Sequence, residues 1–223
     1  MPAFTIFIDQ WPWIAAYLLI ALGAYMLIFG RQHFERCVKI LSSLTMFAVC
    51  SCLLSINGYF ESKIEEGPTA GTVLTILFIL ALGTVLGFTF GAAMPNKFSL
   101  VFICLLNAVI LSMVIYSFLM SFTGTWVVLL ISFFFFGIVC VLLPLKYDQQ
   151  MRIQSTAFLG SWMLTRGISL MVGGYPNEMQ TISWMHSGYV VSTSNYFFVY
   201  LIVLAVLFLI GQRTQRHQWA KEL

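Results

Sequence analysis

Charged residues are scarce in this sequence, and their scarcity excludes most classes of soluble protein. Only 9% of the 223 residues are Asp, Glu, Lys or Arg, whereas 60% are hydrophobic. A soluble domain carries about 25% charged residues, so this chain has too few to cover a surface that faces water. Most soluble enzymes and nucleic-acid-binding proteins are therefore excluded, and the composition predicts a protein surrounded by membrane lipids.

Motifs for catalysis, cofactor binding and metal binding are also missing from the sequence. It contains no HExxH sequence, no phosphate-binding glycine loop and no pair of carboxylates inside an apolar run. The three histidines, His33, His186 and His217, lie in separate regions, and no ligand spacing joins them. We therefore expect a protein that is not an enzyme and that holds no cofactor or metal.

Seven apolar runs dominate what is present. A helix that spans a bilayer needs about 20 apolar residues, and a helix satisfies its own backbone hydrogen bonds within lipid. The runs cover residues 11–30, 39–60, 72–94, 98–120, 125–145, 153–173 and 196–211. The sequence predicts a single all-α domain over residues 1–223, a polytopic membrane protein built as a bundle of seven transmembrane helices.

Lys and Arg are distributed unevenly between the two sides that seven spans define. On the side of the amino terminus, Lys63 is the single basic residue. The opposite side holds Arg31, Arg36, Lys39, Lys97, Lys146, Arg152, Arg213, Arg216 and Lys221. Because basic loops stay in the cytosol or the mitochondrial matrix, we predict the amino terminus outside and the carboxyl terminus inside. The membrane is either an endomembrane or plasma membrane, or the mitochondrial inner membrane.

Arg166 is the charged residue that lies deepest within a predicted span. An arginine at the centre of a bilayer costs at least about 2.5 kcal/mol unless it is paired or hydrated. We favour a structural role, in which carbonyls, an amide or an acid hold Arg166, over a binding or gating role. The candidate partners are Glu178, Asn107 and Asn57. Side chains lean toward the amino terminus of their helix, which predicts that Arg166 leans away from the nearer, outer surface.

Small residues gather in the third and sixth spans. The third span carries a GxxxGxxxG row, and the sixth combines glycine with serine; these residues are Gly83, Gly87, Gly91, Gly160, Ser161 and Gly167. Residues four apart share one face of a helix, and a face of nearly bare backbone allows another helix to approach closely. We predict that these residues pack helices within the chain. Packing against another subunit is the alternative, and a channel lining is the least favoured.

One segment of the sixth span resembles a known membrane family. Residues 160–169 read GSWMLTRGIS and residues 173–178 read GGYPNE, which is similar to the signature of the transmembrane protein 198-like family, also found in transmembrane 7 superfamily member 3. The glycine-spaced third span is similar as well. The resemblance implies a seven-helix membrane domain without established enzymatic activity, and it supplies no catalytic residues. Animal members of that family are linked to signalling scaffolds.

The leading functional interpretation is a non-enzymatic, structural or accessory subunit that packs with other integral membrane proteins or with itself. A large organellar or respiratory assembly is one setting for it. The glycine faces and the near absence of residues outside the membrane support this interpretation. A channel or transporter that places Arg166 and Asn107 along a water-filled path is the alternative. A receptor is a further alternative, although the acidic-Arg-Tyr and Asn-Pro-x-x-Tyr sequences of G-protein-coupled receptors are missing.

Overall fold

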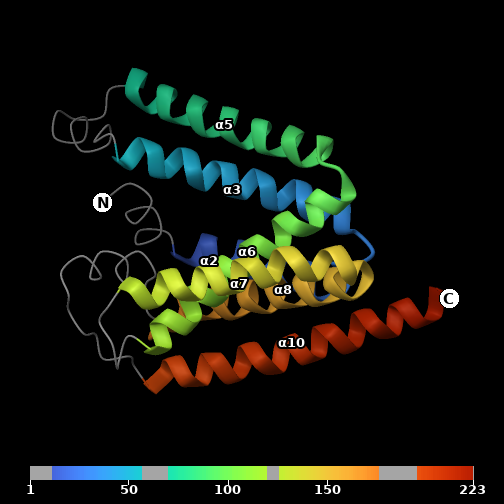
Figure 1. The fold of residues 1–223 in the computed structure, drawn as a ribbon. Helices are drawn as coiled ribbons and strands as arrows, with labels where there is room; N and C mark the ends of the chain where they lie inside the picture. Colours follow the sequence, from blue (N-terminus) through green and yellow to red (C-terminus); the bar gives the residue numbers. More distant parts are fainter. Residues whose placement is uncertain (1–11, 57–69, 120–125, 176–194, 223) are drawn as a thin grey trace. The chain divides into compact units, whose positions relative to one another are not determined.

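The computed structural model describes residues 12–56, 70–119, 126–175 and 195–222 (Figure 1). These residues form seven α-helices, and none of them is in a β-strand. The helices are α2 (Pro12–Phe29), α3 (Phe34–Ile56), α5 (Ala70–Ala93), α6 (Asn96–Leu119), α7 (Trp126–Lys146), α8 (Asp148–Val172) and α10 (Asn195–Glu222). The predicted all-α fold class is confirmed.

The helices differ in how apolar they are. Within the described ranges, three segments are long and apolar enough to cross a membrane by length and composition alone, namely Asn96–Leu119, Val127–Lys146 and Tyr196–Lys221. Two shorter apolar segments there are Trp13–Phe29 and Leu77–Ala93. Helix α8 is more polar, yet its buried residues extend from Met151 to Ser169. A helix enclosed by other helices needs less apolar surface than one that faces lipid, which explains its composition.

Three helices extend at least five residues beyond the predicted spans. Helix α3 begins at Phe34, whereas the predicted span begins at residue 39. Helix α8 begins at Asp148, whereas the predicted span begins at residue 153, and α10 continues to Glu222, whereas the predicted span ends at residue 211. The added turns of α8 and α10 are polar in composition, but each buries a residue on one face, Met151 in α8 and Gln215 in α10. Contact along one face keeps these turns helical although their other faces are exposed.

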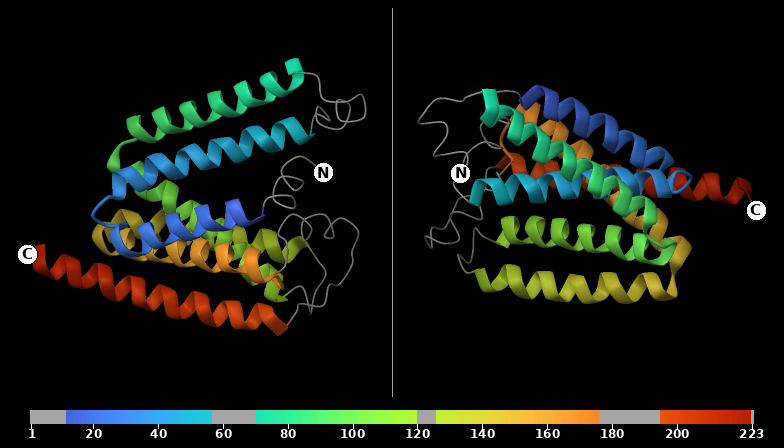
Figure 2. Two further views of the ribbon diagram at one scale, coloured as in Figure 1. Left: turned by 180° about the vertical axis from the view of Figure 1, so that it is seen from behind. Right: turned by 90° about the horizontal axis from the view of Figure 1, so that it is seen from above.

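The chain divides into two compact units, Met1–Ile14 with Glu35–Ser99, and Ala15–Phe34 with Leu100–Leu223. Within the first unit, α3 and α5 lie side by side and antiparallel (Figure 1). Within the second unit, α8 is the central helix, because α10 packs along it and α2 contacts it as well (Figure 2). Both contacts with α8 are antiparallel, so the end of α2, the start of α8 and the end of α10 share one end of this unit.

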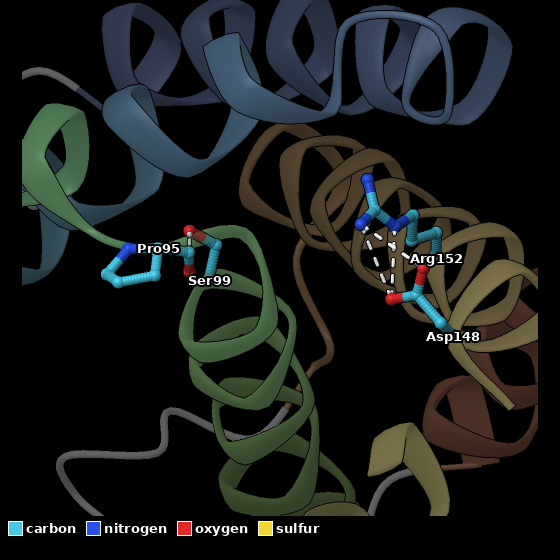
Figure 3. A network of polar contacts seen from close by, with 4 residues as sticks. All are labelled: Pro95, Ser99, Asp148 and Arg152. Carbon is cyan, nitrogen blue, oxygen red and sulfur yellow. Dashed lines mark hydrogen bonds and ion pairs between the residues drawn. The ribbon is translucent and has the colours of Figure 1, made fainter. Parts of the chain in front are cut away.

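A short connection joins α5 to α6 in the first unit. Pro95 lies between the two helices, and Ser99 folds back onto it at the start of α6 (Figure 3). The Ser99 hydroxyl donates to the carbonyls of Met94 at 3.3 Å and Pro95 at 3.2 Å. Proline cannot continue a helical hydrogen-bond ladder, so the chain stops α5 here and begins the next helix within a few residues.

Candidate functional site

The glycine row of α5 lies against α3. A Cβ atom added to Gly83 would lie 2.7 Å from Sγ of Cys50, and one added to Gly87 would lie 2.5 Å from the carbonyl oxygen of Ser42. At Gly91 the added atom would collide with Oγ of Ser42. Real Cβ atoms do not approach other atoms this closely. Backbone atoms of α3 obstruct the added atom at Gly87 and lie close to it at Gly91, whereas at Gly83 the obstructing atom is the end of the Cys50 side chain, which can move.

A hydrogen bond between the same two helices accompanies this close approach. The Ser43 hydroxyl donates to the backbone carbonyl of Thr84 at 2.8 Å. A side chain as short as serine reaches a backbone carbonyl of the next helix only where the two backbones are close. Hydrogen bonds between membrane helices contribute about 1 kcal/mol each, so this contact adds to the packing that the glycines permit.

A second glycine interface joins α2 to α8. A Cβ atom on Gly160 would lie 2.7 Å from the backbone nitrogen of Leu27, and one on Gly23 would lie 2.8 Å from the carbonyl oxygen of Gly160. A Cβ atom on Gly167 would lie 2.9 Å from the carbonyl oxygen of Ala16. The obstructing atoms are backbone atoms, which cannot rotate aside, so the two helices meet almost backbone to backbone.

The glycines of α2 were not predicted to pack, although the sequence holds a signal for them. Gly23 of α2 and Gly30, which directly follows α2, are seven residues apart, as Gly160 and Gly167 are in α8. A seven-residue spacing keeps residues close to one helix face, so matched spacings identify two faces that can meet. Ser161, which was predicted to pack, is fully buried, and its hydroxyl donates to the Phe158 carbonyl of its own helix at 2.7 Å.

Gln215 connects three helices of the second unit. Its side-chain Nε2 donates to the carbonyls of Met26 and Leu27, each at 3.0 Å, in the last turn of α2. Its Oε1 accepts a hydrogen bond from the Thr156 hydroxyl of α8 at 3.0 Å. Gln215 and Thr156 are both completely buried. The Met26 carbonyl also accepts from the Gly30 amide at 3.0 Å, so Gln215 of α10 adds a side-chain cap to the end of α2, where helix carbonyls begin to lack the amides of a following turn.

Asn107 of α6 contacts α8 at a different level from Arg166. Its Nδ2 donates to the carbonyl of Ser155 at 3.0 Å, and the side chain is buried. Ser155 precedes Arg166 by about 16 Å along the axis of α8, at ~1.5 Å per residue. Asn107 is therefore not the partner of Arg166, and the two side chains do not share a site. The other predicted partners, Asn57 and Glu178, lie outside the described residues.

Arg166 extends toward the carboxyl-terminal end of α8. Its Nη1 donates to the Ser169 hydroxyl at 3.2 Å, and its Cζ lies 4.8 Å from the centre of the Tyr175 ring. The predicted lean toward the amino terminus is wrong, because the long side chain reverses the initial direction of its Cα–Cβ bond. A hydroxyl acceptor and the face of an aromatic ring, both favourable for a guanidinium, lie at that end of the helix.

Tyr175 in turn connects this end of α8 to α10. Its ring centre lies 5.5 Å from that of Phe197 and 5.8 Å from that of Tyr200. The Tyr200 hydroxyl donates to the carbonyl of Gly173 at 2.6 Å. Gly173 and Gly174 have φ angles of 82° and 80°, a region that favours glycine. The GGY sequence thus ends α8 and turns a ring back over Arg166.

Comparison with known proteins agrees with this arrangement. The family model described as the TM7S3/TM198-like domain matches residues 16–216, a range that includes all seven helices in whole or in part. No curated protein and no solved structure matches the chain. The matched range includes the glycine faces, Gln215, and the segment from Gly160 to Tyr175 that holds Arg166. The chain is therefore a multi-pass integral membrane protein that belongs to the TM7S3/TM198-like family.

Proposed function

We propose that this protein is a non-enzymatic membrane subunit that packs against other integral membrane proteins. One glycine of α7 carries the proposal. A Cβ atom added to Gly137 would meet no atom of another described helix within 4 Å. In the other helices, every glycine whose surroundings the structure describes has an atom of a neighbouring helix within 3 Å of that position. Among the helical glycines whose surroundings the structure describes, Gly137 is thus the exception, because it is not packed against a neighbouring described helix.

The surroundings of Gly137 favour another helix as its neighbour. Leu130, Phe133 and Phe134 precede it by seven, four and three residues and therefore share its face of α7. They are 40%, 38% and 63% exposed. A glycine beside large side chains makes a hollow in the helix surface, and membrane helices associate where small residues allow close approach. The occupant that this face fits is a transmembrane helix of a partner protein or of a second copy.

The polar side chains of the interior support a structural role rather than catalysis. Asn107 donates to a backbone carbonyl of α8, and Gln215 holds the end of α2. Arg166 donates to a neighbouring hydroxyl and lies over an aromatic ring. Each of these groups contributes a contact that fixes a helix or its end, which is what a packing subunit requires of its polar residues.

The proposed sidedness follows from the basic residues of the second unit. Arg31 follows α2, Arg152 lies in the first turns of α8, and Arg213 lies in the last turns of α10. The antiparallel packing of these helices assigns the three arginines to one end of the unit. By the positive-inside rule, we assign this end to the cytosol, or to the matrix in a mitochondrial membrane, with the amino terminus on the opposite side.

We expect Gly137→Leu to release the partner. Leucine would fill the hollow between the flanking side chains, and overpacking of this kind costs about 1–3 kcal/mol, which weakens association roughly tenfold. The measurement is the mass of the full chain purified in a mild detergent, for which the wild type should exceed the monomer. Ile202→Phe, at a position of α10 that is 65% exposed, is the matched control and should keep the partner. A monomeric wild type would contradict the proposal.

A channel or transporter is the second candidate, and one observation favours it. The Oδ1 atom of Asn107 is buried and accepts no hydrogen bond from any residue that the structure describes. A buried amide oxygen without a donor costs about 1–3 kcal/mol, and a water molecule or a transported solute along α6 would satisfy it. In the form expected from the sequence, this alternative places Asn107 and Arg166 along one water-filled path. Because the two side chains do not share a site, the channel does not include both of them.

Flux measurements separate the two candidates. For the subunit, we expect liposomes that contain the full chain to release potassium and chloride no faster than liposomes without protein, because the polar interior is used for packing. Ion-selective electrodes measure both releases. A flux that Asn107→Leu or Arg166→Gln abolishes, while Ile202→Phe leaves it unchanged, would replace the subunit proposal with the channel.

A further inference from the structure

A polar cavity of about 460 Å³ lies in the second unit, where α2 ends and α8 begins. Its lining consists of Arg31, Gln32, His33, Gln149 and Arg152. All five side chains can donate hydrogen bonds, and none of them is acidic. Ligand cavities typically measure about 300–1,000 Å³, so this one has room for a small charged group.

Aromatic rings hold both arginines of the cavity. The Cζ atom of Arg31 lies 5.7 Å from the ring centre of Trp219, and that of Arg152 lies 4.8 Å from the ring centre of Phe34. A ring covers the face of a guanidinium, whereas its N–H donors point outward in the plane. The arginines are therefore oriented before a ligand arrives, which reduces the entropy that binding must overcome.

The residues that line the cavity include two arginines and no acid. Arg152 is paired with Asp148, with Nη2 3.2 Å from Oδ2, as Figure 3 shows. The Asp148 side chain is 45% exposed and is not part of the lining. The lining itself therefore presents two guanidinium groups and no carboxylate, a composition that favours an anion.

His33 is held in place at the cavity by the last turns of α2. The Tyr25 hydroxyl lies 2.8 Å from Nδ1 of His33, and the two rings stack with centres 5.7 Å apart. This hydrogen bond uses one ring nitrogen and fixes the orientation of the ring. The other nitrogen, Nε2, then serves as the hydrogen-bonding atom for a ligand.

The position of the cavity along the helices indicates what anion it meets. Arg31 directly follows an apolar helix, and Gln149 lies in the first turn of α8, so the cavity is at the level of the membrane surface. It is also on the side to which the basic residues of the chain are assigned. Basic pockets between transmembrane helices on that side bind phosphorylated lipid headgroups, and arginine binds phosphate through paired hydrogen bonds.

We propose that this cavity binds the phosphate of an anionic phospholipid headgroup. Arg31 and Arg152 donate to the phosphate oxygens, while Gln32, Gln149 and His33 supply further donors. The binding is separate from the subunit role of α7, because Gly137 is not part of the cavity lining. A free phosphate ion would accept the same hydrogen bonds as the lipid headgroup. The experiment must therefore distinguish the lipid from a soluble anion.

Native mass spectrometry of the detergent-purified full chain tests the proposal. The probes are dioctanoyl phosphatidic acid, dioctanoyl phosphatidylcholine, and glycerol 3-phosphate, which lacks the acyl chains. We expect phosphatidic acid to bind at least about tenfold more tightly than the other two. If glycerol 3-phosphate binds as tightly as phosphatidic acid, the cavity is a site for a soluble anion. If phosphatidic acid and phosphatidylcholine bind equally, the cavity is not an anion site. Either result overturns the proposal.

The variants assign binding to the cavity. Arg31→Gln and Arg152→Gln should each weaken phosphatidic acid binding about tenfold, because each removes charge-assisted hydrogen bonds. If these variants do not fold, Gln149→Glu tests the same cavity at an exposed position by adding a negative charge, and it should weaken binding similarly. Arg213→Gln removes an exposed positive charge outside the cavity and should bind as the wild type does. Unchanged binding by Gln149→Glu and the folded arginine variants would overturn the proposal.

Discussion

Gly160→Leu should prevent the second unit from folding stably. A Cβ atom at this position would lie 2.7 Å from the backbone nitrogen of Leu27 and 2.8 Å from the carbonyl oxygen of Gly23. To relieve this steric clash, α2 and α8 must separate along their length, because a change of side-chain rotamer cannot move a backbone atom. We expect a loss of more than about 3 kcal/mol, at or above the upper end for overpacked sites. Size-exclusion chromatography in a mild detergent should show aggregation or a strongly reduced yield.

The matched control for this substitution is on α7. Gly137→Leu adds the same side chain to a membrane helix, but none of the other helices that the structure describes has an atom within 4 Å of the added Cβ position. This variant should remain monodisperse and should unfold as the wild type does, even where it loses a partner. Equal stability of the two leucine variants would show that α2 and α8 do not approach as closely as the structure describes.

Gln215→Leu is expected to have the second-largest effect. The substitution removes three hydrogen bonds, two to the carbonyls of Met26 and Leu27 and one from Thr156. It removes the side-chain donor from two buried carbonyls, of which that of Met26 still accepts from the Gly30 amide at 3.0 Å; a buried group that is left unsatisfied costs about 1–3 kcal/mol. Because the single hydroxyl hydrogen of Thr156 can turn instead to the Arg152 carbonyl, which lies 2.7 Å from the hydroxyl oxygen, we expect a total loss of about 2–4 kcal/mol. Thermal unfolding in detergent, followed by circular dichroism, measures it.

Two further variants give this test its specificity. Gln215→Glu keeps the size of the side chain but turns a carboxylate toward two carbonyl oxygens, so it should destabilise at least as much as leucine. Gln212→Leu changes the same residue type one turn earlier in α10, at a half-buried position, and should have little effect. Full stability of the glutamate variant would contradict the role of Gln215 as a cap.

The general architecture could be predicted because it depends on composition and on local pattern. Apolar runs of about 20 residues give membrane helices, and a short motif around Arg166 gave the family. The glycine row of α5 was visible from its four-residue spacing alone. Its contact with α3 could not be derived, since Ser42 and Cys50 show no pattern that distinguishes α3 from the other helices.

The contacts at helix ends were harder to predict. Gln215 lies among Arg213, Arg216 and His217, in a segment whose polar composition indicates a solvent-exposed tail. Gln215 is buried because it lies on the one face of α10 that packs against other helices. Gly211 and Trp219, four residues before and after it, lie on the same face, but this is evident only once α10 is known to continue past residue 211. The direction of Arg166 was mispredicted for a related reason, because a tertiary partner, Tyr175, decided it.

The cap of α2 also sets an order of events during synthesis. Met26 and Gln215 are 189 residues apart in the chain, and ribosomes add about 5–20 residues per second. Helix α2 therefore enters the membrane roughly 10–40 s before the residue that completes its last turn is made. During this interval its glycine face and terminal carbonyls have neither α8 nor α10 as neighbours. We therefore expect α2 to remain surrounded by lipid or by the insertion machinery until translation is nearly complete.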